Sequence, residues 1–361
     1  MVRAIWQEDS KVSALLGGAI KDGLECAPMK VLLEFDTPFS LAHGGMTTLI
    51  EALMRELTEL GIVVEHFRWW DAQQKGDVIH FFQRPSPMTV VLAKQKNYHL
   101  VMTEVIDTFA SLPMTQLLIH RAAYNMLMRF IPTLRENRAL YKEIDAVVYI
   151  NRHELETAMR VYGLEAAKGH VIGVGLEPEV LAELASPAAK GDYLISLGTI
   201  CERKNSILLA KAARIARVPV LFVGGPLAEH DPYYQSFIAH VDQNYVRFAG
   251  YVSEHEKRRL LRAARGFVLL SSGESGCIAV HEAAAAGLSL LLPDLKWVTR
   301  GYPKSSRILT TPLEKMAVVK KLRFLYDNPS VEKTPAIPLL TWRDIAMKYV
   351  DIYKKILIPH A

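Results

Sequence analysis

The chain alternates short apolar runs with longer segments in which apolar residues recur at helical spacing. The runs at 30–35, 145–150 and 267–270 have the length and composition of buried strands. Residues 46–61, which follow the first run, carry leucines every three or four positions, starting at Leu49. Strands that are largely apolar and alternate with helices are typical of parallel sheets covered on both faces. The pattern therefore predicts an α/β fold.

Residues 267–294 form the clearest strand–helix–strand unit. Its first strand ends at Leu270, an alanine-rich helix follows the break at Ser271, and Gly287 stands where a C-cap glycine is expected. A second apolar strand begins at Leu288 and stops at Pro293. We expect the rest of the chain to be organised around this unit.

Two glutamates in this unit require an explanation. Glu274 stands at the entrance of the predicted helix and Glu282 lies near the same face, about 12 Å further along the axis. The first helical amides, those of Ser275, Gly276 and Cys277, would point ahead of the helix and attract a phosphate. The same potential would favour the thiolate of Cys277. The alternative is that Glu274 is only a favourable charge at a helix N-terminus and Glu282 only a solvated helix residue.

Length, composition and charge bound the class of protein. The 361 residues are long for one core and natural for two domains, and 50% of them are hydrophobic. No apolar run approaches the roughly 20 residues of a membrane span. The net charge of +5, from 43 basic and 38 acidic residues, suits an anionic ligand or a membrane surface and does not indicate nucleic acid.

The cysteines and the N-terminal segment favour a cytoplasmic protein. Cys26, Cys201 and Cys277 are far apart and form no CxxC pair, so we expect reduced thiols. Residues 1–18 lack a continuous apolar segment and a clear cleavage site, so export is not expected.

At this point the residues carry a resemblance to a known family. The stretch 274–282, with the sequence ESGCIAVHE, is followed by alanines and then Gly287. It resembles the E-x7-E signature of the retaining family-four glycosyltransferases of the GT-B fold. The chain departs from the usual signature at Gly276, Cys277 and Ser289, where Phe, Gly and Pro are usual.

The resemblance implies an α/β protein of two Rossmann-like domains that face each other across a cleft. It implies transfer of a hexose from a nucleotide sugar to an acceptor hydroxyl with retained anomeric configuration. No cofactor and no bound metal are implied, because basic groups and helix ends neutralise the leaving diphosphate. Glu282 would bind the ribose hydroxyls, and Glu274 would contact the donor sugar near the reacting carbon. The donor stays open between UDP and GDP types, and the acceptor between a glycan, a lipid-linked and a small-molecule acceptor.

The same resemblance divides the chain. We expect an N-terminal acceptor-side domain over residues 1–175 and a C-terminal nucleotide-sugar-binding domain over residues 176–337. Residues 338–361, which include Trp342, resemble a helix that crosses back to the N-terminal domain.

Counterparts of the family's donor-binding residues lie in the C-terminal part. Lys204 matches a lysine that clamps the donor diphosphate, whereas Thr199 stands where an arginine is usual. Arg203 and the hydroxyl of Thr199 would then help Lys204 to meet the phosphate charge. Tyr251 and Val252 follow a strand whose loop contacts the nucleotide base in the family. The alternative for Lys204 is an ordinary surface lysine at the start of a helix.

Candidates in the N-terminal part follow the ends of predicted strands, where ligands of open α/β sheets bind. Gly44 and Gly45 precede the first helix and would let a ligand approach the backbone, unless they only permit a tight turn. His80 lies in a D-V-x-H stretch like that of the family and is a catalytic candidate, with a buried structural histidine as the equal alternative. Glu104, the other catalytic candidate, stands where relatives carry a His-Asp pair and would face the acceptor.

Residues 113–142 alternate apolar and basic side chains, among them His120, Arg121 and Arg129. Such a stretch can lie in a membrane interface, which would place the protein peripherally at the inner face of the membrane. The alternative, which the sequence favours, is a helix packed on the sheet with a solvated basic face.

Two other classes of function stay open. A GT-B sugar-nucleotide epimerase or hydrolase would turn over the donor without an acceptor, and a two-domain sugar-binding protein would not turn it over at all. The pair of Glu274 and Glu282 argues against a passive protein, whereas Thr199 in the place of an arginine keeps an inactive protein under consideration.

Overall fold

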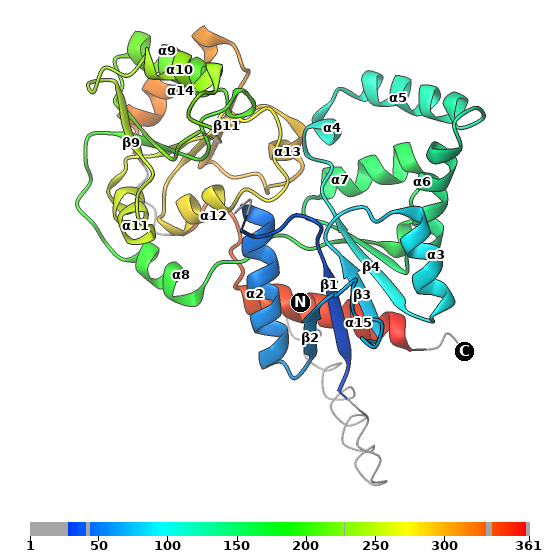
Figure 1. The fold of residues 1–361 in the computed structure, drawn as a ribbon. Helices are drawn as coiled ribbons and strands as arrows, with labels where there is room; N and C mark the ends of the chain where they lie inside the picture. Colours follow the sequence, from blue (N-terminus) through cyan, green and yellow to red (C-terminus); the bar gives the residue numbers. More distant parts are fainter. Residues whose placement is uncertain (1–27, 41–43, 227, 330–333, 359–361) are drawn as a thin grey trace, which may run out of the picture.

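Two six-stranded parallel sheets, each covered by helices on both faces, form the fold (Figure 1). The computed structural model describes residues 28–40, 44–226, 228–329 and 334–358. We call the part built on strands β1–β6 the first half and the part built on strands β7–β12 the second half. The predicted α/β fold with two Rossmann-like domains is confirmed.

The first half contains a sheet with the strand order β2-β1-β3-β4-β5-β6, in which all neighbours are parallel. Val31 and Leu33 of the first strand pack on one side of the sheet and Leu32 on the other, which explains the largely apolar run in the sequence. The strands are β1 Lys30–Glu34, β2 Val63–His66, β3 Val78–Phe81, β4 His99–Glu104, β5 Ala146–Tyr149 and β6 Gly169–Val171. The helices are α2 Gly45–Glu59, α3 Pro87–Gln95, α4 Asp107–Ser111, α5 Met114–Leu127, α6 Pro132–Glu143 and α7 Arg152–Thr157.

The second half repeats this architecture with the strand order β12-β11-β10-β7-β8-β9, again parallel throughout. Ile195 and Leu197 face one layer of helices and Leu194 faces the other. The strands are β7 Leu194–Leu197, β8 Val220–Val223, β9 Val246–Gly250, β10 Phe267–Val268, β11 Leu290–Pro293 and β12 Ile308–Thr311. The helices are α8 Pro178–Ala185, α9 Ser206–Ala216, α10 Pro232–Ile238, α11 Glu254–Ala263, α12 Ile278–Ala285, α13 Lys296–Thr299 and α14 Lys315–Asp327.

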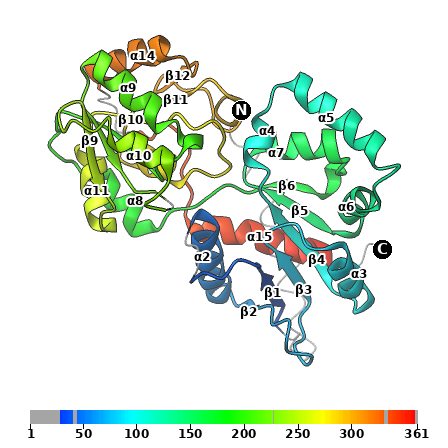
Figure 2. The same ribbon diagram turned by 45° about the horizontal axis from the view of Figure 1, so that its top comes forward.

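The last helix, α15 (Trp342–Leu357), leaves the second half and packs on the first sheet beside α2 (Figure 1, Figure 2). Thr341 and Asp344 form a capping box at its start, which satisfies backbone amides there. Tyr349 and Tyr353 are fully buried in the core of the first half. The core of the first half is therefore completed by α15.

The chain passes between the halves at two segments that lie side by side. The Leu176 amide donates to the Leu340 carbonyl at 2.9 Å, and the Trp342 amide donates to the Leu176 carbonyl at 3.3 Å. Gly175 permits this approach, because a Cβ there would stand 2.6 Å from the Trp342 backbone nitrogen.

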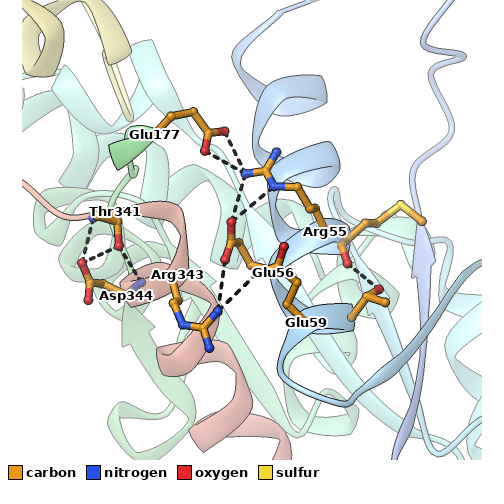
Figure 3. Close-up of polar contacts among 9 residues, drawn as sticks. Arg55, Glu56, Glu59, Glu177, Thr341, Arg343 and Asp344 are labelled. Carbon is orange, nitrogen blue, oxygen red and sulfur yellow. Dashed lines mark hydrogen bonds and ion pairs between the residues drawn. The ribbon is translucent and has the colours of Figure 1, made fainter. Parts of the chain in front are cut away.

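Charged side chains of α2 and α15 form ion pairs beside these two segments (Figure 3). Arg55 donates to both carboxylate oxygens of Glu177, at 2.8 and 3.0 Å, and to Glu56 at 3.1 Å. Arg343 lies 3.3 Å from Glu59. Because most of these side chains are partly exposed, each pair adds little to stability, but together they fix α2 against both segments.

The strands that the sequence predicts agree with those observed to within a few residues, whereas other elements give no clear pattern. Strands β6 and β12 and helices α3, α10 and α14 are not apparent from the sequence. The helix of the 267–294 unit begins later than predicted, at Ile278 with Cys277 as N-cap. The residues before Cys277 therefore belong to a loop.

Gly175→Ala is expected to destabilise the protein, because the new methyl group would meet Thr341 and Trp342 backbone atoms at 2.7 and 2.6 Å. Overpacking of this kind costs roughly 1–3 kcal/mol. Urea unfolding followed by circular dichroism measures the loss. Gly173→Ala is the control, since a Cβ at Gly173 meets nothing within 4 Å. Equal unfolding midpoints for the two variants would contradict the close approach.

Candidate functional site

A pocket of ≈ 610 Å³ lies between the two halves. The start of α2 forms its first-half wall, at Gly44, Gly45 and Thr48. The loop after β7 and the start of α12 form its second-half wall. Ligands of open α/β sheets bind beyond the carboxyl ends of strands, so this pocket is the candidate site.

Two glycines determine the path of the loop after β7: Gly198 lies in this loop, and Gly224 lies just after β8. Gly198 and Gly224 have φ angles of 138° and 123°, which favour glycine. A Cβ at Gly224 would also stand 2.3 Å from the Gly198 carbonyl oxygen. The chain then makes a 3₁₀ turn at Glu202–Lys204, and Asn205 donates to the Leu270 carbonyl at 2.8 Å. The turn is thereby attached to the loop that follows β10.

Arg203 and Lys204 meet on one oxygen of Glu274. Arg203 Nη1 lies 2.8 Å and Lys204 Nζ 2.5 Å from Glu274 Oε1. Arg203 also donates to the Gly273 carbonyl at 2.6 Å. Burial alone would lower the pKa of Lys204, but Cys277 and Glu274 outweigh it and raise this pKa. Two cations that share one carboxylate leave a positive charge that suits an anionic ligand.

The N-terminus of α12 also faces this pocket. Its N-cap is Cys277, and its first residues, Ile278 and Ala279, line the pocket. The Val280 amide donates to the Cys277 carbonyl at 3.0 Å, so the two amides before it precede the first hydrogen bond of the helix. Such amides and the helix dipole favour a negatively charged group.

The thiol of Cys277 is not activated, which corrects the expectation from sequence. Burial, followed by the charge of Glu274, raises the pKa of Cys277 to about 11, although Lys204 acts in the opposite sense. The thiol is therefore protonated at neutral pH and unreactive. Its side chain packs in the core of the second half.

Glu282 lines the same pocket as Lys204 and Glu274. It is buried, and its Oε1 lies 2.8 Å from Lys257 Nζ, which also lies 2.7 Å from Glu254. Burial raises the pKa of Glu282, and Lys257 opposes this shift. A buried carboxylate with a cation beside it is suited to accept hydrogen bonds from hydroxyl groups.

Gly44, Gly45 and Thr199 line the pocket as well. A Cβ at either glycine would meet nothing within 4 Å, so a ligand can approach the backbone there. Gly44 has a φ of −157°, an extended geometry that any residue adopts. Thr199 lies on the wall where the resemblance leads us to expect an arginine, and Arg203 supplies positive charge at that wall.

Ser275 and Gly276 connect the two halves. Ser275 Oγ donates to Glu154 Oε1 at 2.5 Å. A Cβ at Gly276 would stand 2.5 Å from Ile150 Cγ2 and 2.6 Å from Val174 Cγ1. Glycine therefore permits the halves to touch at a position where the family usually carries phenylalanine.

Tyr251 and Val252 do not appear among the described residues that line the pocket. Tyr251 is exposed, and its hydroxyl donates to the Pro226 carbonyl at 2.8 Å while its ring lies against Gly225. Val252 packs on the core of the second half. The structure does not bring these two residues together with the groups around Glu274.

His80 lies in the core of the first half and not at the cleft, which corrects the expectation from sequence. It is fully buried, with Nδ1 2.7 Å from the Tyr353 hydroxyl and Nε2 2.8 Å from the Thr103 hydroxyl. Its ring stacks on Phe82. Burial lowers the pKa of His80 to about 3, so the imidazole is neutral. The physical reason for the buried position is that α15 packs over the end of β3.

Side chains of the first half bind Glu104 as well. The expectation from sequence that Glu104 faces an acceptor is therefore corrected. Glu104 Oε1 accepts from Arg84 at 2.8 and 2.5 Å. Its Oε2 accepts from Tyr141 at 2.7 Å and from Tyr149 at 2.5 Å. Burial, followed by the charge of Glu104, raises the pKa of both tyrosines, so their hydroxyls keep the protons they donate.

Lys257 and Glu254 also line the pocket, and neither is predicted as a site residue from the sequence. Lys257 is one of several basic residues of α11, and nothing in its spacing separates it from the others. No group of three or more His, Cys, Asp and Glu side chains within the described ranges could hold a metal ion.

A family model matches much of the second half. Residues 191–328 match the family described as Glycosyl transferases group 1. The match includes Lys204, Glu274 and Glu282. No curated protein matches the chain.

Solved structures show the same fold over most of the chain. A glycosyltransferase from Rickettsia africae is 13% identical with a TM-score of 0.67, over 92% of this chain and 100% of its own. Sucrose-phosphate synthase from Thermosynechococcus elongatus is 18% identical with a TM-score of 0.63, over 91% of this chain and 99% of its own. HepE from Anabaena, solved in complex with UDP-glucose, is 16% identical with a TM-score of 0.56, over 91% of this chain and 98% of its own. These similarities show the two-domain GT-B fold.

His80→Gln is expected to flatten the dependence of stability on acid pH. The pKa of His80 is about 3 in the folded protein and about 6.5 in the unfolded chain, so the unfolded chain binds an extra proton between these values. The contribution to stability is complete above about pH 6.5 and is lost as the pH falls toward 3, by up to about 1.4 kcal/mol per pH unit. Urea unfolding between about pH 7.5 and pH 4 measures the slope.

Exposed His255 on α11 provides the control variant, His255→Gln, which should keep the wild-type slope. His153, whose pKa burial lowers to about 4, contributes in the same pH range in all three proteins. The buried position of His80 would be contradicted if both variants gave the same slope.

Proposed function

We propose that the protein is a glycosyltransferase that transfers a hexose from a nucleoside-diphosphate sugar to an acceptor hydroxyl with retained anomeric configuration. One observation carries the proposal: Glu274, held by Lys204 and Arg203, shares a single pocket with Glu282 and the N-terminus of α12. The match of residues 191–328 to the group 1 glycosyl transferases supports it. So does the fold shared with a solved glycosyltransferase.

The donor diphosphate would lie between Lys204, Arg203 and the amides at the start of α12. The hydroxyl of Thr199 and the backbone at Gly276 and Cys277 would complete its surroundings. As the bond to the sugar breaks, negative charge grows on the diphosphate, and fixed cations and amides stabilise it without reorganising. The proposed reaction therefore uses no cofactor and no bound metal.

The two carboxylates would bind different parts of the donor. Glu282, buried beside Lys257, would accept hydrogen bonds from the ribose hydroxyls. Glu274 would contact the hexose near its reacting carbon once the diphosphate takes over Lys204 and Arg203. The acceptor proton would pass to the departing phosphate oxygen, so no protein nucleophile is required. The buried His80 takes no part in this proposal.

A solved structure supports the choice of nucleotide, and the lining of the pocket supports the side from which the acceptor would approach. HepE was solved with UDP-glucose, which supports a nucleoside diphosphate sugar and makes UDP the first nucleotide to test. Gly44 and Gly45 would let the acceptor or the donor sugar approach the backbone of α2. Glu104 is occupied by Arg84 and tyrosines and is given no catalytic role.

Nucleotide titration tests the clamp. Lys204→Ala is expected to weaken binding of UDP or GDP by roughly 1.5–3 kcal/mol, because a charge-assisted contact to phosphate is lost. Glu282→Ala should weaken the same ligands through the ribose. Glu274→Ala should leave them unchanged or tighten them, because it releases Lys204 and Arg203 for the phosphates. Calorimetry gives the affinities, and turnover of a panel of nucleotide sugars should fail in Glu274→Ala.

Lys211→Ala on α9 is the control for the lysine, since Lys211 is exposed and outside the pocket. Equal losses in Lys204→Ala and Lys211→Ala would remove Lys204 from the site. Turnover of the donor without any acceptor would indicate an epimerase or a hydrolase in place of a transferase.

We also propose that the protein associates peripherally with anionic membranes through α5 and the residues that follow it. Ile119 is 67% exposed and Phe130 77% exposed, and the basic residues Arg121 and Arg129 are exposed as well. An apolar surface beside basic residues suits a membrane interface. No helix of the described ranges is long and apolar enough to cross a membrane.

Vesicle co-sedimentation tests the membrane proposal. The double variant Ile119→Glu/Phe130→Glu should lose binding to vesicles that contain phosphatidylglycerol, because it places charge where apolar side chains would enter the interface. Met316→Glu/Phe324→Glu on α14 is the matched control, since both residues are exposed and apolar. The proposal fails if both double variants sediment like the unmodified protein.

A further inference from the structure

A second pocket of ≈ 380 Å³ adjoins the pocket proposed for the donor. Gly45, Glu274 and Gly276 line both pockets. A molecule in the second pocket would therefore reach Glu274, which we place beside the donor hexose. In the proposed reaction an acceptor would occupy this position.

The first half supplies most of the wall of this pocket, and the side chains that form this wall are apolar. Five of its strands end next to the pocket, and the residues that line it just after them are Phe35, Phe82, Val105, Ile150 and Val174. Met46 and Leu49 of α2 complete the wall. Ligands of open α/β sheets contact the residues after the strand ends. The body of the acceptor would therefore meet apolar side chains on every side that the first half provides.

Polar side chains are few in this pocket. Among its described lining residues they are Glu274 and Ser275. Ser275 Oγ donates to Glu154, and Glu274, which accepts from two cations here, would contact the donor hexose when the donor is bound. A sugar acceptor would bury hydroxyl groups against hydrocarbon, and each unpaired one would weaken binding by a factor of about ten to a hundred.

The exposed part of the wall indicates what an occupant would cover. Val105 is 40% exposed although it follows a central strand of the sheet. Phe35 and Met46 are only partly buried. Apolar contact with these side chains would remove hydrocarbon surface from water, which favours binding.

We infer that the acceptor is an alcohol with an apolar body, aliphatic or aromatic, and that its hydroxyl extends from this second pocket toward Glu274. The inference rests on the proposed transferase function and specifies the substrate class of that site. A glycan acceptor is excluded by it.

The transfer balances with this acceptor. The alcohol oxygen forms a bond to the anomeric carbon while the bond from that carbon to the diphosphate oxygen breaks. The electron pair of the broken bond stays on the diphosphate, and the hydroxyl proton passes to that oxygen. Nothing is oxidised or reduced, and the products are a glycoside of the apolar alcohol and a nucleoside diphosphate.

Binding of three alcohols tests the inference. The probes are geraniol, which is aliphatic, 2-naphthalenemethanol, which is aromatic, and methyl α-glucoside, which is hydrophilic. Saturation-transfer NMR titrations should show binding of at least one apolar alcohol and weaker binding of the glucoside. The tighter of the two apolar probes distinguishes an aliphatic from an aromatic source.

Val105→Asn should weaken the apolar alcohol about five- to tenfold, because it replaces hydrocarbon contact by a polar amide. Val171→Asn is the matched control, since Val171 is 42% exposed at the end of β6 and does not line the pocket. Thermal melting of both variants establishes that they are folded.

Two results would overturn the inference: tighter binding of methyl α-glucoside than of both apolar alcohols, or equal affinity of Val105→Asn and Val171→Asn for the apolar probe. UDP and GDP titrations of the unmodified protein run beside these measurements. Failure to bind any nucleotide would overturn the proposed function, whereas nucleotide binding together with either of the two results would overturn the acceptor class alone.

Discussion

The shared hydrogen bonds on Glu274 are the interaction on which the functional loops of the second half depend. A buried carboxylate without cationic partners would be strongly unfavourable, so the loop after β7 and the loop after β10 fix each other. The backbone repeats this coupling, because the Ser272 amide donates to the Arg203 carbonyl at 2.8 Å. The cations that a diphosphate would require are thus already held in place within the protein, and binding of the proposed donor would exchange one anion for another instead of ordering mobile side chains.

The first half depends in a different way on the end of the chain. Tyr349 and Tyr353 of α15 bond to Thr103 and His80, at 3.1 and 2.7 Å, in the middle of its core. Because α15 follows the whole second half in the sequence, the core of the first half contains a segment that the chain reaches only after the second half. The adjacent crossing segments at Leu176 then hold the two halves at the separation that leaves the pockets between them.

The sequence predicts those features that local pattern and spacing determine. Apolar runs located most strands, and the motif spacing indicated both glutamates, but Glu274 lies in the loop before α12 and not on the helix that the sequence predicts there. Contacts between distant segments could not be predicted from the sequence. Tyr353 covers His80 from the far end of the chain, Arg84 occupies Glu104 from a loop, and Lys257 faces Glu282 from a helix whose basic residues look alike in sequence. The sequence shows the residue type of each partner. The direction in which its side chain points depends on tertiary packing, which no short pattern encodes.

The glycine at position 276 has a consequence for the fidelity of the proposed reaction. With no side chain there, the motif loop lies against Ile150 and Val174, whereas a phenylalanine would act as a spacer between the halves. Any gap held open by a spacer would fill with solvent, and an activated sugar is attacked by water as well as by an alcohol. In the proposed transferase, the close contact at Gly276 would therefore limit the access of water to the donor and favour glycoside formation over hydrolysis.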